Sequence, residues 1–326
     1  MEFLSEEPGI DSIREIYDKY YKGATLILNS LHHYWKPIAA LYRSLESIFN
    51  HQVQVNMYLT PQNSQGFPPH FDTHEVFILQ IEGAKLWRIY NTFQLFPLPI
   101  SEQPIPKEKL GEPLHEVLLN AGDMLYIPSG YVHEALTSEC SSLHLTVGIN
   151  VYRWADLLSS ALAAVTERNV SFRKSLPVGF LKRSDTTQPL KYHFEELLQI
   201  FLSSAKVEDA VERLSQRVIE EMPPMPDGHF TQIDSVNSIG VDTIVQKRKG
   251  ALCSIFREQN SVIIQFPGNK VRGPKHIEPA LHFIASSEEF PIRSLPDSLS
   301  DNSKLVLVRR LVREGLLAVV HSRRKT

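Results

Sequence analysis

The spacing of apolar residues changes in character along the chain, and each change predicts a different kind of structure. Residues 11–50 carry scattered apolar positions that suit short helices covering the mouth or the side of a barrel. From Val53 to Tyr152 the pattern becomes short alternating or apolar runs separated by turn residues, which is typical of antiparallel β-structure. The expected strands lie within residues 53–60, 75–83, 85–91, 115–130 and 141–150.

A helical period follows Tyr152. Apolar residues then recur with the i, i+3, i+4, i+7 spacing of one helix face. This stripe consists of Trp154, Leu157, Leu158, Ala161, Leu162 and Val165. Two further helices are expected over Tyr192–Ser203 and Val207–Met222, and the sequence MPPMPDG ends the helical pattern as a linker.

The last hundred residues mix helix-like and strand-like stretches in the order expected of a small α+β module. We interpret this region as winged-helix-like, with a helix over Lys304–Arg313, a helix end at Gly315 and a strand over Leu316–Val320. The sequence therefore predicts three domains. They are a β-barrel with a helical lead-in over residues 1–153, a helical domain over 154–228 and the winged-helix-like domain over 229–326.

Composition narrows the class of protein. Hydrophobic residues make up 42% and charged residues 22% of the chain, as in ordinary globular proteins. No apolar run approaches the roughly 20 residues that cross a bilayer, and the acidic N-terminus lacks the features of a secretory signal. Cys140 and Cys253 are too few and too far apart for a disulfide framework or a thiolate zinc site. We expect a soluble, intracellular protein, cytoplasmic in a prokaryote, with a nuclear or nucleolar location open in a eukaryote.

Charge is distributed unevenly. Residues 229–326 carry 15 Lys+Arg against 9 Asp+Glu, whereas residues 1–228 carry 19 against 28. A basic C-terminal region can mark a module that faces nucleic acid. We favour the plainer interpretation, a mildly basic solvated surface, and keep nucleic-acid binding through residues 229–326 as the alternative.

The strongest chemical signal is a set of two histidines and one carboxylate. His70 and Asp72 stand in the sequence PPHFDTHEVF, and His133 follows Asp72 by 61 residues in GDMLYIPSGYVHEA. Alternation along a strand would turn residues 70 and 72 to the same side. Such a facial triad holds nonheme iron(II) on three positions and leaves three open for a bidentate cosubstrate and O₂.

His-x-Asp alone is common by chance, and the downstream block makes the metal site specific. Pro128 and Gly130 predict a tight turn between two barrel strands, and His133 stands just after this turn. His74 shares the expected face of His70 and Asp72, and we interpret it as a polar neighbour of the metal site rather than a ligand.

The strands at both ends of the predicted barrel have one apolar and one polar face. On residues 53–60 the polar face consists of Gln54, Asn56 and Tyr58, and on residues 141–150 it consists of His144, Thr146 and Gly148. We expect the apolar faces to pack against neighbouring layers and the polar faces to line the lumen. A solvent-facing sheet would show the same alternation, but the metal ligands favour the barrel. The predicted fold class is α+β, with a double-stranded β-helix barrel of the cupin or jelly-roll type.

Lys85 follows the second expected strand and is flanked by Leu86 and Trp87. A lysine in such a setting usually extends to the surface. Beside this metal motif we instead expect its ammonium group to pair with the distal carboxylate of 2-oxoglutarate in a largely dry barrel. We also expect Arg88 and Glu75 to form a structural pair within the sheet.

The stretch NMYLTPQNSQGFPPHFDTHEVFILQIEGAKLWRIY, together with GDMLYIPSGYVHEA, resembles the ribosomal oxygenases of the Jumonji-C family, which hydroxylate side chains of ribosomal proteins. The resemblance implies His70, Asp72 and His133 as iron ligands and Lys85 as the 2-oxoglutarate anchor. It places Asn56 and Tyr58 beside the substrate side chain and Thr146 near the cosubstrate. It further implies a homodimer formed through residues 154–222.

The expected activity is therefore an iron(II)- and 2-oxoglutarate-dependent dioxygenase reaction that uses O₂ to hydroxylate a histidyl or arginyl side chain of a ribosomal protein. The resemblance implies departures from close histidyl-hydroxylating relatives at His74, where an apolar residue is usual, and at Gly148, where a small hydroxyl residue is possible. Two alternatives stay open: a JmjC-type N-methyl-lysine demethylase, and a non-catalytic metal-binding cupin or scaffold. Formaldehyde release would distinguish the first, and the need for a buried cation at Lys85 argues against the second.

Overall fold

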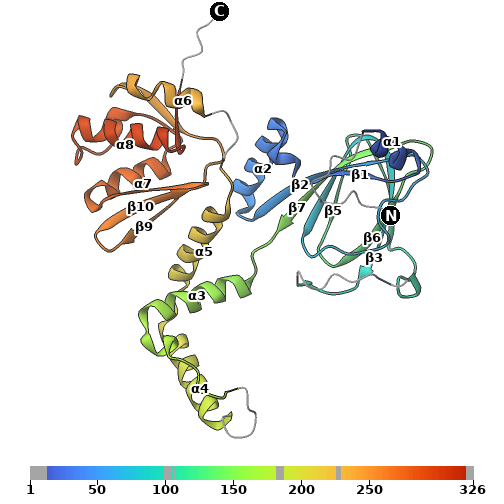
Figure 1. The fold of residues 1–326 in the computed structure, drawn as a ribbon, viewed down its shortest axis with the longest axis horizontal. Helices are drawn as coiled ribbons and strands as arrows, with labels where there is room; N and C mark the ends of the chain where they lie inside the picture. The colour runs from blue at the N-terminus through green and yellow to red at the C-terminus, as the bar shows by residue number, and fades with distance from the viewer. Residues whose placement is uncertain (1–12, 99–104, 106, 181–186, 225–228, 321–326) are drawn as a thin grey trace, which may run out of the picture. The chain divides into compact units, whose positions relative to one another are not determined.

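The computed structural model describes residues 13–98, 105, 107–180, 187–224 and 229–320 (Figure 1). It divides into two compact units, Met1–Val151 and Tyr152–Thr326. Among the described helices, none combines the length and the apolar character needed to cross a membrane.

The first unit is built on antiparallel strands, as the alternating pattern predicts. The order in its sheet is β1 (Leu26–Leu28), β2 (Gln52–Thr60), β7 (Ser142–Asn150), β3 (Glu75–Thr92) and β4 (His115–Asn120). Strands β5 (Met124–Ile127) and β6 (Tyr131–Leu136) also pair with β3. Every one of these pairings is antiparallel.

Strand β3 is one long element, so the two separate strands predicted over 75–83 and 85–91 are wrong. Its first half pairs with β7 and β5, and its second half pairs with β4 and β6. The register against β7 shifts between Gln80 and Glu82, which marks a β-bulge. A bulge bends a strand without ending it, and so β3 continues from one half of the barrel into the other.

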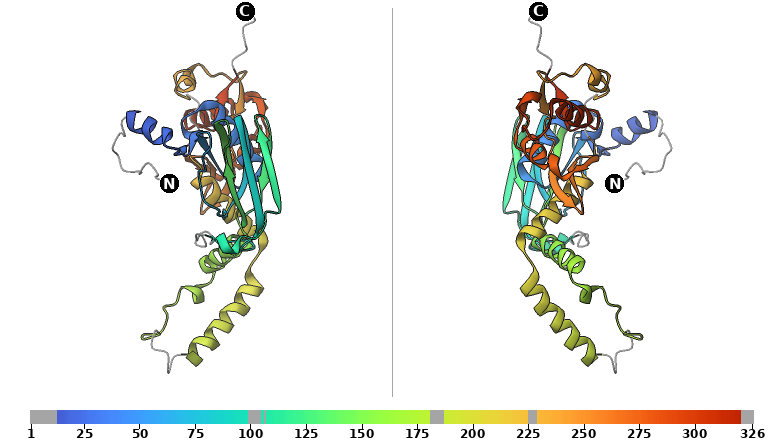
Figure 2. Two further views of the ribbon diagram at one scale, coloured as in Figure 1. Left: turned by 90° about the vertical axis from the view of Figure 1, so that its right-hand side faces the viewer. Right: turned by 90° about the vertical axis from the view of Figure 1, so that its left-hand side faces the viewer.

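Two helices, α1 and α2, precede β2 in the chain, in agreement with the predicted helical lead-in. Helix α2 (Lys36–Phe49) buries Ile38 and Tyr42 against the apolar face of β2 and β7, where Val55 and Val147 are fully buried. Helix α1 (Ile13–Tyr21) has no buried residue and stands clear of the strands in both views of Figure 2. The apolar faces of these strands therefore pack against a helix, which leaves their polar faces for the interior.

The second unit begins with the three helices that the apolar stripes predict. They are α3 (Trp154–Arg168), α4 (Thr187–Ser204) and α5 (Val207–Glu221). Helices α3 and α5 are joined by the ion pairs Arg168–Asp209 and Arg213–Glu167. Part of the predicted helical domain, residues 181–186 and 225–228, lies outside the described residues.

The remainder of the second unit mixes helices and strands around one hydrophobic core. Its two three-stranded sheets have the orders β11-β10-β9 and β12-β8-β13. The strands are β8 (Ile244–Lys247), β9 (Ser254–Glu258), β10 (Ser261–Phe266), β11 (Asn269–Pro274), β12 (Glu289–Pro291) and β13 (Leu317–Val319). The helices are α6 (Phe230–Asp234), α7 (Glu278–Ser286) and α8 (Asp301–Arg313).

Helix α8 begins three residues before the predicted start. Ser300 caps it, because its side chain accepts a hydrogen bond from the backbone N–H of Ser303. Buried Val308, Leu311 and Val312 join α8 to the core of this region. A helix followed by a strand at the C-terminal end is therefore present, as predicted.

Candidate metal centre and its cavity

The first unit encloses a cavity with a volume of about 530 Å³. Its walls come from β2, β3, β6, β7 and the segment that links β2 to β3. The predicted site residues His70, Asp72, His133, Lys85, Asn56, Tyr58 and Thr146 all line it. A cavity of this size can enclose a small organic ligand together with a metal ion.

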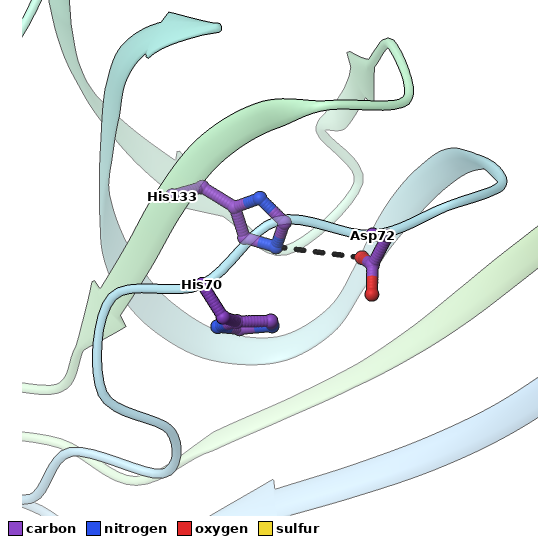
Figure 3. Close-up of side chains that lie close together, drawn as sticks. All are labelled: His70, Asp72 and His133. Carbon is purple, nitrogen blue, oxygen red and sulfur yellow. Dashed lines mark ion pairs between the residues drawn. The ribbon is translucent and has the colours of Figure 1, made fainter. Parts of the chain in front are cut away.

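The three predicted metal ligands converge from two segments of the chain (Figure 3). The backbones of His70 and His133 form a reciprocal bridge, with N···O distances of 3.1 and 2.8 Å. The N–H of Gly130 donates to the carbonyl oxygen of Asp72 at 2.9 Å. The prediction that His70 and Asp72 lie on a strand is wrong, because this link between β2 and β3 forms only two isolated bridges, at Gln65 and at His70.

The possible ligand atoms of His70, Asp72 and His133 lie within 4.8 Å of one another. Figure 3 shows the Nε2 atom of His133 facing a carboxylate oxygen of Asp72, at 3.6 Å. This set of donor atoms suits a divalent transition metal, because two imidazole nitrogens and one carboxylate oxygen occupy one side of it.

Both histidines are held in the orientation that metal binding requires. The Nδ1 atom of His70 lies 2.9 Å from the carbonyl oxygen of Pro68, and that of His133 lies 3.1 Å from the carbonyl oxygen of Tyr131. A carbonyl can only accept, so each Nδ1 carries the proton and each Nε2 keeps its lone pair for a metal. Burial and the neighbouring His70 lower the pKa of His133 to about 4, which keeps it neutral.

The turn before β6 depends on Gly130. Its φ of +85° falls in the left-handed region, and a Cβ atom there would lie 2.1 Å from the carbonyl oxygen of Gln94. Only glycine fits both conditions. This turn sets where β6 begins and therefore where His133 stands.

Lys85 lies on the wall of the same cavity and is only 4% exposed. Its Nζ donates to Thr60 Oγ1 at 2.9 Å and lies 5.9 Å from the centre of the Trp87 ring. Burial lowers the pKa of Lys85 to about 8, and no charged neighbour contributes to the shift. In the described part of the chain, no carboxylate is paired with this ammonium group.

The bulge in β3 is what turns Lys85 inward. Val76 and Ile78 before the bulge and Lys85 and Trp87 after it line the same cavity, although their numbers differ in parity. Side chains alternate along a strand, so one extra residue at the bulge exchanges the two faces. The Gln80 side chain bridges the bulge, because its Nε2 donates to Glu82 O at 2.9 Å and to Ser142 Oγ at 2.8 Å.

The polar faces of β2 and β7 form a ladder along the cavity. In register, Gln54 pairs with Gly148, Asn56 with Thr146, and Tyr58 with His144. The Tyr58 ring stacks on His144 with centroids 5.0 Å apart, and burial together with the charge of Asp72 raises the pKa of Tyr58. The backbone N–H of Ser30 donates to Asn56 Oδ1 at 2.9 Å, which fixes that amide.

The sequence did not single out Trp87, which lines the cavity, or Thr60, which accepts a hydrogen bond from Lys85. Both could have been found by alternation, since Thr60 follows Tyr58 and Trp87 follows Lys85 by two residues on the inward face. The Nε1 atom of Trp87 and the Nδ1 atom of His144 are buried and have no hydrogen-bond partner among the described residues. A polar ligand in the cavity would supply partners for such donors.

The expected pair of Arg88 and Glu75 does not form. Arg88 instead contacts Glu116 at 2.6 Å and Glu134 at 3.7 Å, and Glu75 accepts a hydrogen bond from Tyr126 at 2.6 Å. The reason is the length of β3, which places these two residues at its opposite ends.

Comparison with known proteins agrees with the geometry. Residues 31–157 match the family described as JmjC domain. Ribosomal oxygenase 1 of Rattus norvegicus is 37% identical over 205 residues, covering 56% of this chain and 33% of the relative. The Dictyostelium discoideum protein named bifunctional lysine-specific demethylase and histidyl-hydroxylase NO66 is 31% identical over 258 residues, covering 72% of this chain and 48% of the relative. The chain thus spans less than half the length of these two relatives.

Solved structures show the same fold. The Escherichia coli ribosomal oxygenase YcfD, in a complex with cobalt and 2-oxoglutarate, superposes with a TM-score of 0.56 at 21% identity. The superposition covers 91% of this chain and 78% of YcfD. The barrel therefore belongs to the JmjC domain family, and the chain resembles the ribosomal oxygenases in sequence and in fold.

Proposed function

We propose that this protein is an iron(II)- and 2-oxoglutarate-dependent oxygenase that hydroxylates a side chain of a ribosomal protein. One observation carries the proposal: the buried ammonium group of Lys85, which has no paired carboxylate in the described chain, shares a cavity with His70, Asp72 and His133. A buried charge is costly unless it is paired. An anionic ligand that also reaches the metal would supply the missing partner.

The donor set fits iron(II). His70 Nε2, His133 Nε2 and one oxygen of Asp72 would hold the metal, with the two Nδ1–H groups fixed by the carbonyls of Pro68 and Tyr131. A histidine–histidine–carboxylate set with open positions is characteristic of nonheme iron(II) oxygenases.

The cavity also fits 2-oxoglutarate. Lys85 and Thr60 would bind its distal carboxylate, and the unpartnered Trp87 Nε1 and His144 Nδ1 offer further polar contacts nearby. Thr146 lies between these groups and Asn56 on the β7 wall, close to the expected path of the cosubstrate. The YcfD complex with cobalt and 2-oxoglutarate gives a precedent within the same fold.

When bound together, iron(II), 2-oxoglutarate and O₂ supply an oxidative decarboxylation that yields succinate and CO₂ and leaves one oxygen atom for a substrate C–H bond. The protein contributes binding and orientation. Lys85 holds the cosubstrate at one end of the cavity, and the apolar residues Val76 and Ile78 help to keep water from the centre.

Asn56 and Tyr58 would orient the substrate side chain. Because Ser30 N–H donates to Asn56 Oδ1, the group that this amide can offer to a substrate is its Nδ2, a hydrogen-bond donor that also contacts Tyr58. A neutral histidine offers an acceptor nitrogen, whereas an arginine offers only donors. This contact favours a histidyl over an arginyl substrate, in line with the name of the NO66 relatives.

The same cavity could serve an N-methyl-lysine demethylase, and the name of the NO66 relatives includes that activity. Demethylation would release formaldehyde, whereas hydroxylation of a carbon atom leaves a stable product. A non-catalytic cupin would have no use for the buried cation at Lys85 and would turn over no 2-oxoglutarate.

We also propose roles for the remaining domains. Helices α3 and α4 expose apolar side chains that would form a homodimer interface within residues 154–222. These are Trp154, Leu158, Leu162, Tyr192, Phe194, Leu198 and Leu202. Residues 229–326 would form the winged-helix-like domain, and its Arg257 and Arg272 are paired with Glu278 and Glu258. Charges paired within the domain argue against nucleic acid as its main partner.

The test is iron(II)-dependent conversion of 2-oxoglutarate to succinate by the wild type and by His133→Ala, with and without extracted ribosomal proteins. We expect turnover in the wild type but not in His133→Ala, together with a shift of +16 Da, or one oxygen atom, on one ribosomal protein. His115→Ala is the matched control, because this exposed histidine lies on β4 away from the cavity lining. Absence of succinate from folded, iron-loaded wild type would reject the oxygenase, and formaldehyde from methylated peptides would favour the demethylase.

A further inference from the structure

His74 and Gly148 are far apart in the sequence but lie against each other in the structure. A Cβ atom on Gly148 would lie 2.7 Å from Cδ2 and 2.8 Å from Nε2 of His74, and 2.9 Å from Nε2 of Gln54. Real side-chain atoms do not approach so closely. The imidazole of His74 therefore occupies the space that a side chain at position 148 would take.

This contact lies at the end of the cavity opposite to Lys85. Gln54 pairs with Gly148 at one end of the β2–β7 ladder, and Thr60, which binds Lys85, stands at the other. Six residues of extended strand separate Gln54 from Thr60, or roughly 20 Å. A five-carbon dicarboxylate is about 7 Å long, so a molecule held by Lys85 ends well short of Gln54. The His74 end of the cavity is left to the substrate.

The side chain of Gln54 determines which ring nitrogen of His74 carries the proton. Gln54 Nε2 lies 3.4 Å from His74 Nε2. An amide nitrogen can only donate, so His74 accepts at Nε2 and carries its proton on Nδ1. That Nδ1–H belongs to the ring edge away from Gly148, and it has no partner among the residues described. His74 lines the cavity and therefore has one hydrogen-bond donor to offer there.

We propose that His74, positioned by Gln54 and made possible by Gly148, is a specificity-determining residue that donates a hydrogen bond to an acceptor atom of the substrate side chain. The proposal rests on the oxygenase function and names its substrate class: side chains that carry an acceptor near the oxidised carbon, such as a neutral imidazole or a carboxamide. An aliphatic side chain or a guanidinium group would leave the Nδ1–H without an acceptor on the substrate, which disfavours it.

The packing part of the proposal is tested by a cycle of melting temperatures for Gly148→Ala, His74→Ala and the double variant. We expect Gly148→Ala to lower the melting temperature by several degrees and the double variant to recover most of that loss, because the new Cβ then meets no imidazole. Gly240→Ala is the control, since nothing lies within 4 Å of its Cβ position. Additive losses in the double variant would overturn the placement of His74 against Gly148.

The specificity part uses a protease digest of ribosomal proteins as the probe, with iron(II), 2-oxoglutarate and O₂. We expect His74→Leu, which keeps volume but loses the donor, to raise the KM for the modified peptide at least tenfold or to change which peptides gain 16 Da. His74→Gln, which restores a donor, should regain much of the wild-type selection. Metal affinity, measured by calorimetry with Co(II), should be equal in all three proteins.

The proposal would be overturned if wild type and His74→Leu had equal KM values and modified the same peptides. It would also be overturned if no peptide stimulated the conversion of 2-oxoglutarate by the wild type. Absence of any succinate from the wild type would instead defeat the oxygenase function itself. The melting-temperature cycle would still report on the His74–Gly148 packing in that case, so the two failures are distinguishable.

Discussion

The Nζ atom of Lys85 lies 2.9 Å from Thr60 Oγ1, and that hydroxyl lies 3.1 Å from Thr25 Oγ1. Within the described chain the neutral hydroxyl of Thr60, itself supported by Thr25, is thus the one hydrogen-bond partner of this buried cation. Burial of a charge without a counter-ion opposes folding. The arrangement is best explained by a ligand that brings its own negative charge.

The first prediction concerns the pH dependence of 2-oxoglutarate binding. Burial lowers the pKa of Lys85 to about 8, so its charge is lost as the pH rises through that value. A bound carboxylate favours the charged form, and binding near pH 8 to 9 should therefore take up a proton. Above pH 8 we expect the Kd of the iron-loaded, anaerobic protein to rise about tenfold per pH unit.

Calorimetry in buffers of different ionisation enthalpy would measure both the Kd and the proton uptake. Lys85→Arg is the control, because a guanidinium keeps its charge to about pH 12. Its affinity should be lower than that of the wild type but independent of pH in this range. A wild-type Kd that stays constant between pH 7 and 9.5 would contradict the role of Lys85.

The second prediction is that Lys85→Met stabilises the fold while it abolishes cosubstrate binding. The pKa of Lys85 is lowered in the folded protein, so the unfolded chain binds more protons above pH 8 and stability rises with pH there. Below pH 8 the full cost of the buried charge is present. Removing it should raise the free energy of unfolding at pH 7 by about 2 kcal/mol, after allowance for the lost bond to Thr60. Urea denaturation at pH 7 and at pH 10 would test this, and a lower stability at pH 7 would count against it.

The third prediction concerns the proposed dimer. Leu158 is 57% exposed on α3 and belongs to the stripe that includes Trp154 and Leu162. A carboxylate at its centre should disrupt an apolar interface, so Leu158→Asp should shift the protein from dimer to monomer in light scattering after gel filtration. Ser159→Asp places the same charge on the neighbouring exposed residue and should leave the dimer intact. A wild-type protein that is already monomeric would reject the interface.

Sequence patterns were sufficient to predict the structural features that depend on local periodicity. The alternation of residues 53–60 predicts the two faces of β2, and helix α2 indeed covers the one with Val53 and Val55. The stripes of α3 and α5 predict those helices because each buries one side only. The short strands β8 and β12 were not predicted, since three or four residues give too little periodicity to distinguish them from loop.

Features that depend on contacts between distant segments could not be predicted. The flanking residues of Lys85 suggest a role in ligand binding. They do not show that a bulge exchanges the two faces of β3, so that Lys85 and Ile78 line the same cavity. The sequence likewise gives the identities of His74 and Gly148 without showing that one occupies the space left by the other. In both cases the decisive information is the register of β3 or β2 against β7.

The fourth prediction tests the bulge through Gln80. This side chain is buried, and its amide donates to Glu82 O, to Ser142 Oγ and, at 3.4 Å, to Leu143 O. Gln80→Leu removes those donors and leaves buried acceptors without a partner, which should cost about 2 kcal/mol of unfolding free energy. Because the bulge sets which face of β3 carries Lys85, relaxation of its register should also weaken 2-oxoglutarate binding at least tenfold.

Ile81→Ala is the matched control. Ile81 lies in the same bulge but is 48% exposed, and truncation of its side chain should change neither the stability nor the binding appreciably. If Gln80→Leu lost stability but bound 2-oxoglutarate as tightly as Ile81→Ala, the inward orientation of Lys85 would not depend on this clamp.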